Sequence, residues 1–74
     1  MSNIGIIGGE LHMATYIVNT GPNKEVHRTA YTVSSCKISD ISPNHRLDTE
    51  VDYTVLYPSE YDGCKHCYSE KHRK

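Results

Sequence analysis

Phenylalanine and tryptophan are absent from the chain, and only fourteen of its 74 residues are isoleucine, valine or leucine. Burial of apolar side chains supplies most of the free energy that offsets the conformational entropy lost on folding. So few apolar groups exclude the core of an ordinary enzyme domain and limit the chain to one small domain. We therefore expect an additional cross-link, such as a disulfide or a bound metal ion.

Long apolar runs are also missing. Apolar runs such as Ile6-Ile7 and Val55-Leu56-Tyr57 reach at most three residues, whereas a membrane-spanning helix needs roughly 20 apolar residues. The charged fraction is 23% and the formal net charge is only −1, which does not fit the composition of a disordered chain. We expect a folded protein with no membrane partner.

The cysteine count is odd, with thiols at Cys36, Cys64 and Cys67. No basic segment followed by a long apolar segment resembles a signal peptide, so we expect a cytoplasmic, reducing environment. There, three thiols that include a Cys-x-x-Cys pair fit metal ligands better than a disulfide framework. Five histidines supply further donors. Zinc is the expected cross-link, because thiolate and imidazole are its preferred protein ligands.

The chain divides at its first strand-like segment. Residues 1–13 are rich in glycine and end at a second methionine. We expect them to be a flexible leader or the remnant of an added tag, or else an edge strand through Ile4, Ile6 and Ile7. Residues 14–74 show no repeat and no linker, so they are expected to form a single zinc-binding module.

The strand signals predict a hairpin and a third strand. Residues 15–20 and 25–33 are rich in β-forming residues, and residues 21–24 have turn chemistry, which together predict a β-hairpin. Neither face of its second strand is cleanly apolar, so this strand should be half-buried. Residues 47–52 are expected to be an acidic loop and residues 53–57 the last strand.

The remaining segments predict short helical turns. Residues 34–44 are expected to be irregular or 3₁₀-like and to dock Ile38 and Ile41. At most one helical turn fits in residues 58–62, before Gly63. Residues 68–74 should form a short helix or fray. The expected fold class is α+β, mostly β: a small zinc-stabilised domain with a hairpin, a third strand and a short C-terminal helix or turn.

The segment Cys64-Lys65-His66-Cys67 is the strongest chemical motif. A tight Cys-x-x-Cys turn brings two sulfurs to one metal and points backbone N–H groups at the thiolates. Cys36 lies 28 residues earlier, far enough to return from the far side of a hairpin. In the alternatives, Cys36 is a small buried apolar residue and the other two thiols are incidental, or the pair is redox-active. Thioredoxin-like chemistry, however, needs a βαβ setting for which this chain has no room.

Four segments of the chain resemble the Ada-type metal-binding domain, and the likeness covers about residues 15–67. The family pattern has a strand, a turn and a second strand that ends at the first ligand, then a Ser-Pro-x-Asn-Arg-like loop and a terminal Gly-Tyr-x-Pro-Cys-Lys-x-Cys. The matching segments are Tyr16-Ile-Val-Asn-Thr-Gly-Pro-Asn-Lys-Glu-Val-His27-Arg28, Ser35-Cys36, Asp40-Ile-Ser-Pro-Asn44 with Arg46, and Tyr61-Asp-Gly-Cys64-Lys-His-Cys67.

The resemblance implies a zinc ion held by His27, Cys36, Cys64 and Cys67. This chain departs from the family in the longer His-x8-Cys spacing, in a helix reduced to residues 59–62, and in the first ligand. DNA-repair members have a cysteine at the first ligand position, where it accepts a methyl group from a phosphotriester. The imidazole of His27 is not that thiolate nucleophile. We therefore expect no methyl transfer and no catalytic activity, as in the stand-alone, His-containing branch.

The residues alone leave the fourth ligand open. His27 is the first choice, and His72 is the main rival because Cys64-x2-Cys67-x4-His72 copies the first part of a zinc knuckle. His66 should face away from the metal within its turn, and His45 lies in a loop. Four protein ligands leave no open position for water, so the expected site is structural.

Charge and aromatic residues bear on the partner. Basic residues cluster only at Lys65, Lys71, Arg73 and Lys74, and residues 40–62 carry six of the nine carboxylates, unlike a typical nucleic-acid footprint. The tyrosines at 53, 57 and 61 either complete the core or form an exposed strip typical of protein interfaces.

The leading functional hypothesis is a non-catalytic zinc-binding module, zinc finger-like in its use of the metal. It would act as a binding or regulatory adaptor for an unidentified protein partner, without a small-molecule substrate. The first alternative is weak nucleic-acid binding through Lys65, Lys71, Arg73 and Lys74, and the second is thiol redox chemistry. A module of this size would suit a phage or bacterial accessory protein.

Overall fold

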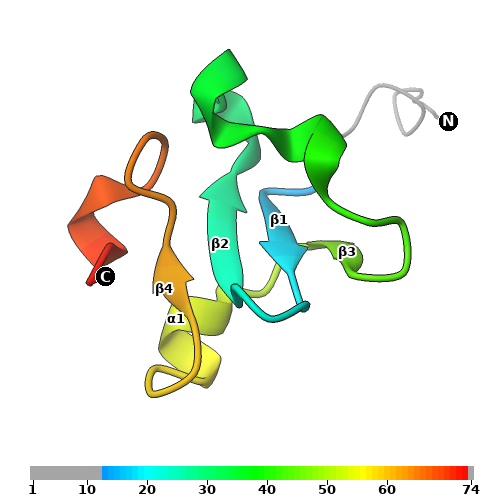
Figure 1. Ribbon diagram of the computed structural model, residues 1–74. Coiled ribbons are helices and arrows are strands. Elements are labelled where there is room, and N and C mark those ends of the chain that lie inside the picture. Colours follow the sequence, from blue (N-terminus) through cyan, green and yellow to red (C-terminus); the bar gives the residue numbers. More distant parts are fainter. Residues whose placement is uncertain (1–12, 74) are drawn as a thin grey trace, which may run out of the picture.

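A computed structural model describes residues 13–73 as a chain of short elements around one small sheet (Figure 1). The leader expected over residues 1–13 lies outside the described residues except for Met13. The α+β class is confirmed. In chain order the elements are β1 (Tyr16–Asn19), β2 (Glu25–Arg28), the 3₁₀ helices η2 (Thr29–Tyr31), η3 (Ser34–Cys36) and η4 (Ile38–Asp40), β3 (Arg46–Thr49), α1 (Tyr53–Leu56), β4 (Asp62–Gly63) and the 3₁₀ helix η5 (Ser69–Lys71).

The four strands form a mixed sheet in the order β3-β1-β2-β4. β1 is antiparallel to both β2 and β3, and β4 runs parallel to β2. The expected hairpin is confirmed: β1 and β2 are joined by a turn in which the Lys24 N–H donates to the Gly21 carbonyl at 3.1 Å. The chain reaches β4 only after η2, η3, η4, β3 and α1, so segments far apart in sequence meet at this edge (Figure 1).

The central strands are buried on both faces. Val18 lies opposite Val26 on one face, and Ile17 lies opposite His27 on the other, because successive side chains of a strand alternate. All four side chains are buried. The expectation of a half-buried second strand is therefore wrong for β2. Tyrosine side chains cover one of its faces and cysteine side chains cover the other.

Tyrosines complete the apolar face, as the lack of Phe and Trp requires. Tyr16 stacks on Tyr68 with ring centroids 6.1 Å apart, and Tyr53 meets Tyr61 edge-to-face at 5.2 Å. Tyr57 stays 44% exposed. The buried cluster and the residues packed against it are Val18, Val26, Tyr61, Tyr68, Tyr16 and Tyr53.

A carboxylate links α1 to the C-terminal segment. Asp52 caps α1 by accepting the Thr54 N–H at 2.9 Å and the Thr54 hydroxyl at 2.7 Å, and it also accepts the Tyr68 hydroxyl. Burial, together with this bond to Asp52, raises the pKa of Tyr68 to about 12. Burial acts to raise the pKa of Asp52, but the hydrogen bonds from Tyr68 and Thr54 outweigh it and hold that pKa below its usual value.

Three expectations for local structure are wrong. Residues 53–57, expected as a strand, form α1 and its C-terminal cap, because the Asp52 cap satisfies the first turn. Residues 47–52 were expected to be a loop, but residues 47–49 belong to β3. The side chains of this edge strand are largely exposed, so its sequence does not alternate between apolar and polar residues. The second strand ends at Arg28, and η2 follows where residues 29–33 were expected to continue it.

The other short segments match their expectations. η3 and η4 are the 3₁₀-like turns of residues 34–44, and Ile38 and Ile41 are half-buried there. The C-terminal segment forms η5, which packs beside β4 at the edge of the sheet opposite β3 (Figure 1). Within residues 13–73, no helix has the length and apolar character to cross a membrane.

We predict that Gly63→Ala destabilises the fold more than Gly21→Ala. A Cβ at Gly63 would clash with the backbone oxygen of Tyr68 and lie 2.9 Å from the Lys71 Cβ, and overpacking of this kind costs about 1–3 kcal/mol. A Cβ at Gly21 would meet mainly the exposed His45 ring, 2.7 Å away, which can rotate. Denaturant unfolding of both variants checks this, and equal losses of stability would contradict it.

Candidate metal centre

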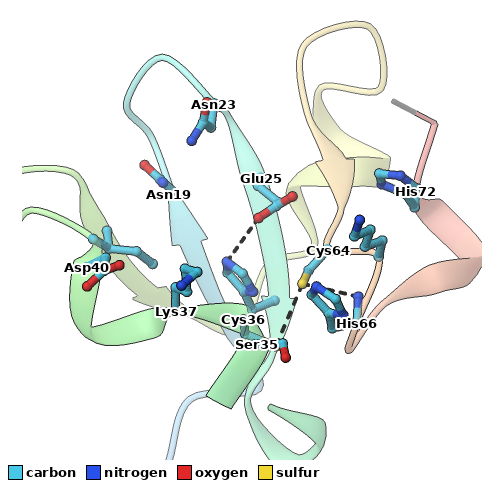
Figure 2. Close-up of a pocket in the computed structure, with 13 residues that line it drawn as sticks. Asn19, Asn23, Glu25, Ser35, Cys36, Lys37, Asp40, Cys64, His66 and His72 are labelled. Atoms are coloured by element: carbon cyan, nitrogen blue, oxygen red, sulfur yellow. Dashed lines mark hydrogen bonds and ion pairs between the residues drawn. The ribbon is translucent and has the colours of Figure 1, made fainter. Parts of the chain in front are cut away.

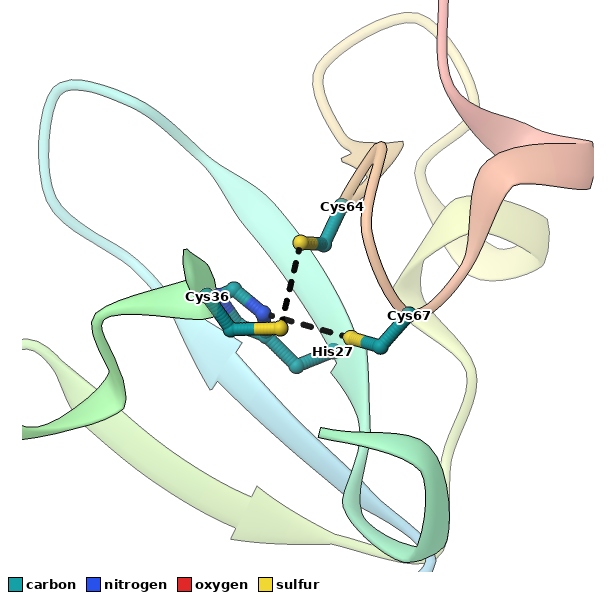
Figure 3. Close-up of side chains that lie close together, drawn as sticks. All are labelled: His27, Cys36, Cys64 and Cys67. Atoms are coloured by element: carbon teal, nitrogen blue, oxygen red, sulfur yellow. Dashed lines mark hydrogen bonds between the residues drawn. The ribbon is translucent and has the colours of Figure 1, made fainter. Parts of the chain in front are cut away.

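Four side chains of residue types that bind metal ions converge on the second face of the sheet. His27 lies on β2, Cys36 is the last residue of η3, and Cys64 and Cys67 follow β4 (Figure 3). Their ligand atoms all lie within 4.8 Å of one another, and all four residues are buried. The Sγ atoms of Cys36 and Cys64 are 3.7 Å apart, and the Cys67 Sγ is 3.5 Å from His27 Nδ1.

Cys36 is positioned by a tight turn. Its N–H donates to the Val33 carbonyl at 2.9 Å, and the Val33 N–H donates to the Cys36 sulfur at 3.4 Å. Lys37, the next residue, has a φ of 55°, in the left-handed region that ends η3 and starts η4. The long His-x8-Cys spacing is thus taken up by η2 and η3, which return the chain to β2.

Cys64 and Cys67 are positioned by the end of β4. The Cys64 N–H donates to the Val26 carbonyl at 2.8 Å, which fixes the turn beside His27. The Tyr68 N–H then closes the turn on the Cys64 carbonyl at 2.7 Å. The His66 N–H donates to the Cys64 sulfur at 3.4 Å, the type of N–H to sulfur bond that the Cys-x-x-Cys motif predicts.

Burial sets the protonation of these groups. It lowers the pKa of His27 and so favours the neutral imidazole that a metal requires. Burial also raises the pKa of Cys64, and that of Cys67 to about 12. None of the three cysteines forms a disulfide; the Cys36 and Cys64 sulfurs, 3.7 Å apart, are well beyond the roughly 2.05 Å of such a bond. A cation supplies the positive charge that allows such buried thiols to ionise. The donor set therefore fits a metal ion.

Glu25 stands behind the histidine. Its Oε1 lies 3.4 Å from His27 Nε2, while Nδ1 of the same ring faces Cys67. A carboxylate on the outer nitrogen orients a metal-ligating imidazole and raises its basicity. The sequence reasoning missed Glu25, although residues two apart on a strand share a face and the Glu-x-His spacing carried this signal.

Arg28 stands behind the Cys-x-x-Cys turn. Its Nε donates to the Cys67 carbonyl at 2.8 Å, and its guanidinium lies 4.5 Å from the Tyr31 ring and 4.8 Å from the Tyr68 ring. Glu70 pairs with the guanidinium at 3.3 Å. Sequence reasoning missed this role too, because the contacts with Cys67, Tyr68 and Glu70 join residues about forty positions apart.

The rival histidines lie outside the cluster. His72 Nδ1 is 3.2 Å from the Gly63 carbonyl oxygen and 3.2 Å from an Asp62 carboxylate oxygen. His45 and His66 are exposed, and neither contributes to the group of four donors.

The basic residues proposed for nucleic acid do not form a single free tail. Lys65 and Lys71 are exposed. Arg73 donates from its guanidinium to the Tyr61 carbonyl at 2.9 Å and from its backbone to Asp62 at 3.2 Å. Lys74 lies outside the described residues.

A polar cleft of about 530 Å³ opens onto one side of the cluster. His27, Cys36 and Cys64 line it, whereas Cys67 does not. Figure 2 shows Glu25 and Lys37 among the side chains around it. The cleft therefore lies against three of the four donor residues.

We predict that Arg28→Lys destabilises the protein by about 1.5 kcal/mol. Lysine has no planar guanidinium, so it cannot donate to the Cys67 carbonyl while also lying over the rings of Tyr31 and Tyr68. Arg46→Lys is the matched control: its 2.8 Å pair with Asp48 is exposed and should contribute at most about 1 kcal/mol. Denaturant unfolding of the two variants measures the difference. Equal effects would remove the assigned role of Arg28.

No protein family, curated protein or solved structure matched the chain.

Proposed function

We propose that this protein is a non-catalytic zinc module that acts as a binding or regulatory adaptor in a reducing compartment. The observation that carries the proposal is the convergence of three buried thiols and one buried imidazole from three separate segments. Cys67 and His27 are 40 positions apart in the chain and 28 positions separate Cys64 from Cys36. A bound ion would therefore join the hairpin, the η3 turn and the C-terminal turn at one point.

Donor spacing supports zinc. Tetrahedral zinc has Zn–S distances of about 2.3 Å and Zn–N distances of about 2.0–2.1 Å, which place neighbouring sulfurs about 3.8 Å apart and sulfur and nitrogen about 3.6 Å apart. Two of the six donor separations are 3.7 Å, between the Cys36 and Cys64 sulfurs, and 3.5 Å, between the Cys67 sulfur and His27 Nδ1, and none of the six exceeds 4.8 Å. Three thiolates and one imidazole form a common structural zinc set with no position left for water.

The energetic role follows from the small core. Structural zinc contributes about 10–16 kcal/mol to the folding of zinc-finger peptides at neutral pH. Here the ion would stabilise the sheet face that carries Ile17 and His27, where cysteines take the place of an apolar layer. The role of the metal in this proposal is to hold the fold, and the function lies on the surface that the fold presents.

The Ada-type resemblance is part of the proposal. His27, in place of the methyl-accepting cysteine, lies in the donor cluster, which supports a structural metal and no methyl transfer. Redox chemistry is disfavoured because a reactive thiol needs a lowered pKa, whereas burial raises the pKa of Cys67 to about 12. A phosphate-binding tail is disfavoured because Arg73 is engaged with Tyr61.

We predict that His27→Ala abolishes stoichiometric zinc binding, whereas His72→Ala retains one zinc per chain. His27 contributes a donor to the cluster, and His72 instead contacts Gly63 and Asp62. Native mass spectrometry of both variants measures the stoichiometry. In the unmodified protein, excess chelator should collapse the dispersion of the amide NMR spectrum.

Two results would contradict this proposal. One is a dispersed spectrum that persists in excess chelator. The other is rapid alkylation of Cys64 and Cys67 in the native state, because zinc-bound sulfurs react slowly and rapid reaction would favour the redox alternative.

We predict that Glu25→Gln weakens zinc binding about tenfold while keeping the one-to-one stoichiometry. Loss of the carboxylate charge 3.4 Å from His27 Nε2 lowers the basicity of the ring, and such outer-shell changes cost 10–100-fold in affinity. Glu60→Gln is the control, because Glu60 is exposed, lies between α1 and β4, and does not belong to the donor cluster. Competition with a chromogenic chelator gives both affinities, and an unchanged value for Glu25→Gln would rule out this role.

A further inference from the structure

The strand β3 stands at one edge of the sheet. Within residues 13–73 it pairs with β1 and with no other strand, since the strand order is β3-β1-β2-β4. Its residues are exposed, except that Thr49 is half-buried. The outer side of β3, residues Arg46–Thr49, is called the β3 edge below. An unpaired strand edge offers its backbone N–H and C=O groups to another strand.

The side chains of the β3 edge divide between the two faces of the sheet. Leu47 lies opposite Val18, so it extends the face that carries the tyrosine cluster, and it is 37% exposed. Arg46 and Asp48 lie on the other face, where Arg46 Nε is 2.8 Å from Asp48 Oδ1 and the two side chains are 40% and 47% exposed. The hydrogen bond from Arg46 lowers the pKa of Asp48, so this carboxylate is charged at neutral pH. The neighbouring strand β1 has no charged residue.

This order of side chains is complementary to itself. When two β3 strands pair antiparallel about Leu47, each Leu47 faces the Leu47 of the other copy. Arg46 of each chain then faces Asp48 of the other, and the two opposite-charge pairs are equivalent by two-fold symmetry. At the ends of this register His45 faces Thr49, so no like charges meet.

The charges also select this register over its neighbours. The tyrosine faces of both copies lie on one side of the joined sheet only if the pairing is centred on a residue. A centre at Arg46 would place two guanidinium groups opposite each other, and a centre at Asp48 would do the same with two carboxylates. Like charges directly opposite each other destabilise a strand pair.

We propose that the β3 edge binds the β3 edge of a second copy of this chain, antiparallel and centred on Leu47. The two leucines would extend the Val18 layer across the interface, and oligomerisation is one way in which a chain with a small core gains stability. The β3 edge is only four residues long, so the dimer is weak and concentration-dependent. This inference goes beyond the proposed adaptor role and uses none of the metal donors.

The test measures the mass of the full, zinc-loaded chain by sedimentation equilibrium over a range of concentrations. We expect a monomer–dimer equilibrium. Arg46→Asp and Asp48→Arg should each weaken the dimer at least tenfold, because each replaces two opposite-charge pairs with two like-charge pairs. An equimolar mixture of the two variants should restore the dimer, since a cationic edge then faces an anionic edge.

Glu60→Arg is the matched control, because it reverses the charge of an exposed residue outside β3. It should leave the equilibrium unchanged. A second measurement needs no variant: dilution of the unmodified protein should shift the amide resonances of residues 45–49.

Four results would overturn the proposal. They are a chain that stays monomeric up to about 1 mM, a dimer that neither β3 variant weakens, a mixture of folded variants that does not recover the dimer, and dilution shifts confined to other segments. A monomer whose β3 resonances respond to Ile6→Ser would also overturn it and would identify residues 1–12 as the occupant of the edge.

Zinc stoichiometry, measured on the same samples, separates the two proposals. One zinc per chain in a protein that stays monomeric would overturn the dimer and leave the zinc module intact. A folded chain that takes up no zinc, yet forms the dimer and responds to the variants as expected, would overturn the zinc module and support the β3 edge.

Discussion

The meeting of His27 with Cys67 across the sheet is the contact on which the rest of the structure depends. It requires the hairpin to present one face of β2 and β4 to align beside Val26, and the full donor cluster also requires η3 to bring Cys36 back toward that face. With so few apolar residues, the valine and tyrosine cluster covers the opposite face, while the donor face has mainly Ile17 and Ile38 beside the cysteines. The proposed metal cross-link at the donor cluster would remove the need for a second apolar layer.

The fold could be predicted where local chemistry decided it. The hairpin followed from its turn residues, and the 3₁₀ turns of residues 34–44 followed from a short polar segment. β3 could not be predicted, because an exposed edge strand has no apolar face and pairs through its backbone. Residues 53–57 have strand propensity, but the Asp52 cap and the burial of Thr54 select a helical turn.

The candidate site was partly visible in the sequence. The Cys-x-x-Cys spacing and a third cysteine indicated a shared ligand, but five histidines left the fourth donor open until the Ada-type resemblance pointed to His27. The structure places His27 among the thiols and His72 elsewhere. The roles of Glu25 and Arg28 were not predicted, because they depend on which segment packs against each face of β2. Strand pairing in the folded sheet determines that packing.

One strand of four residues serves both halves of the interior. Val26 belongs to the tyrosine cluster, and its neighbour His27 belongs to the donor cluster, so neither layer can form while β2 is unpaired. Ordering the tyrosines and assembling the four donors are therefore coupled through the pairing of β2.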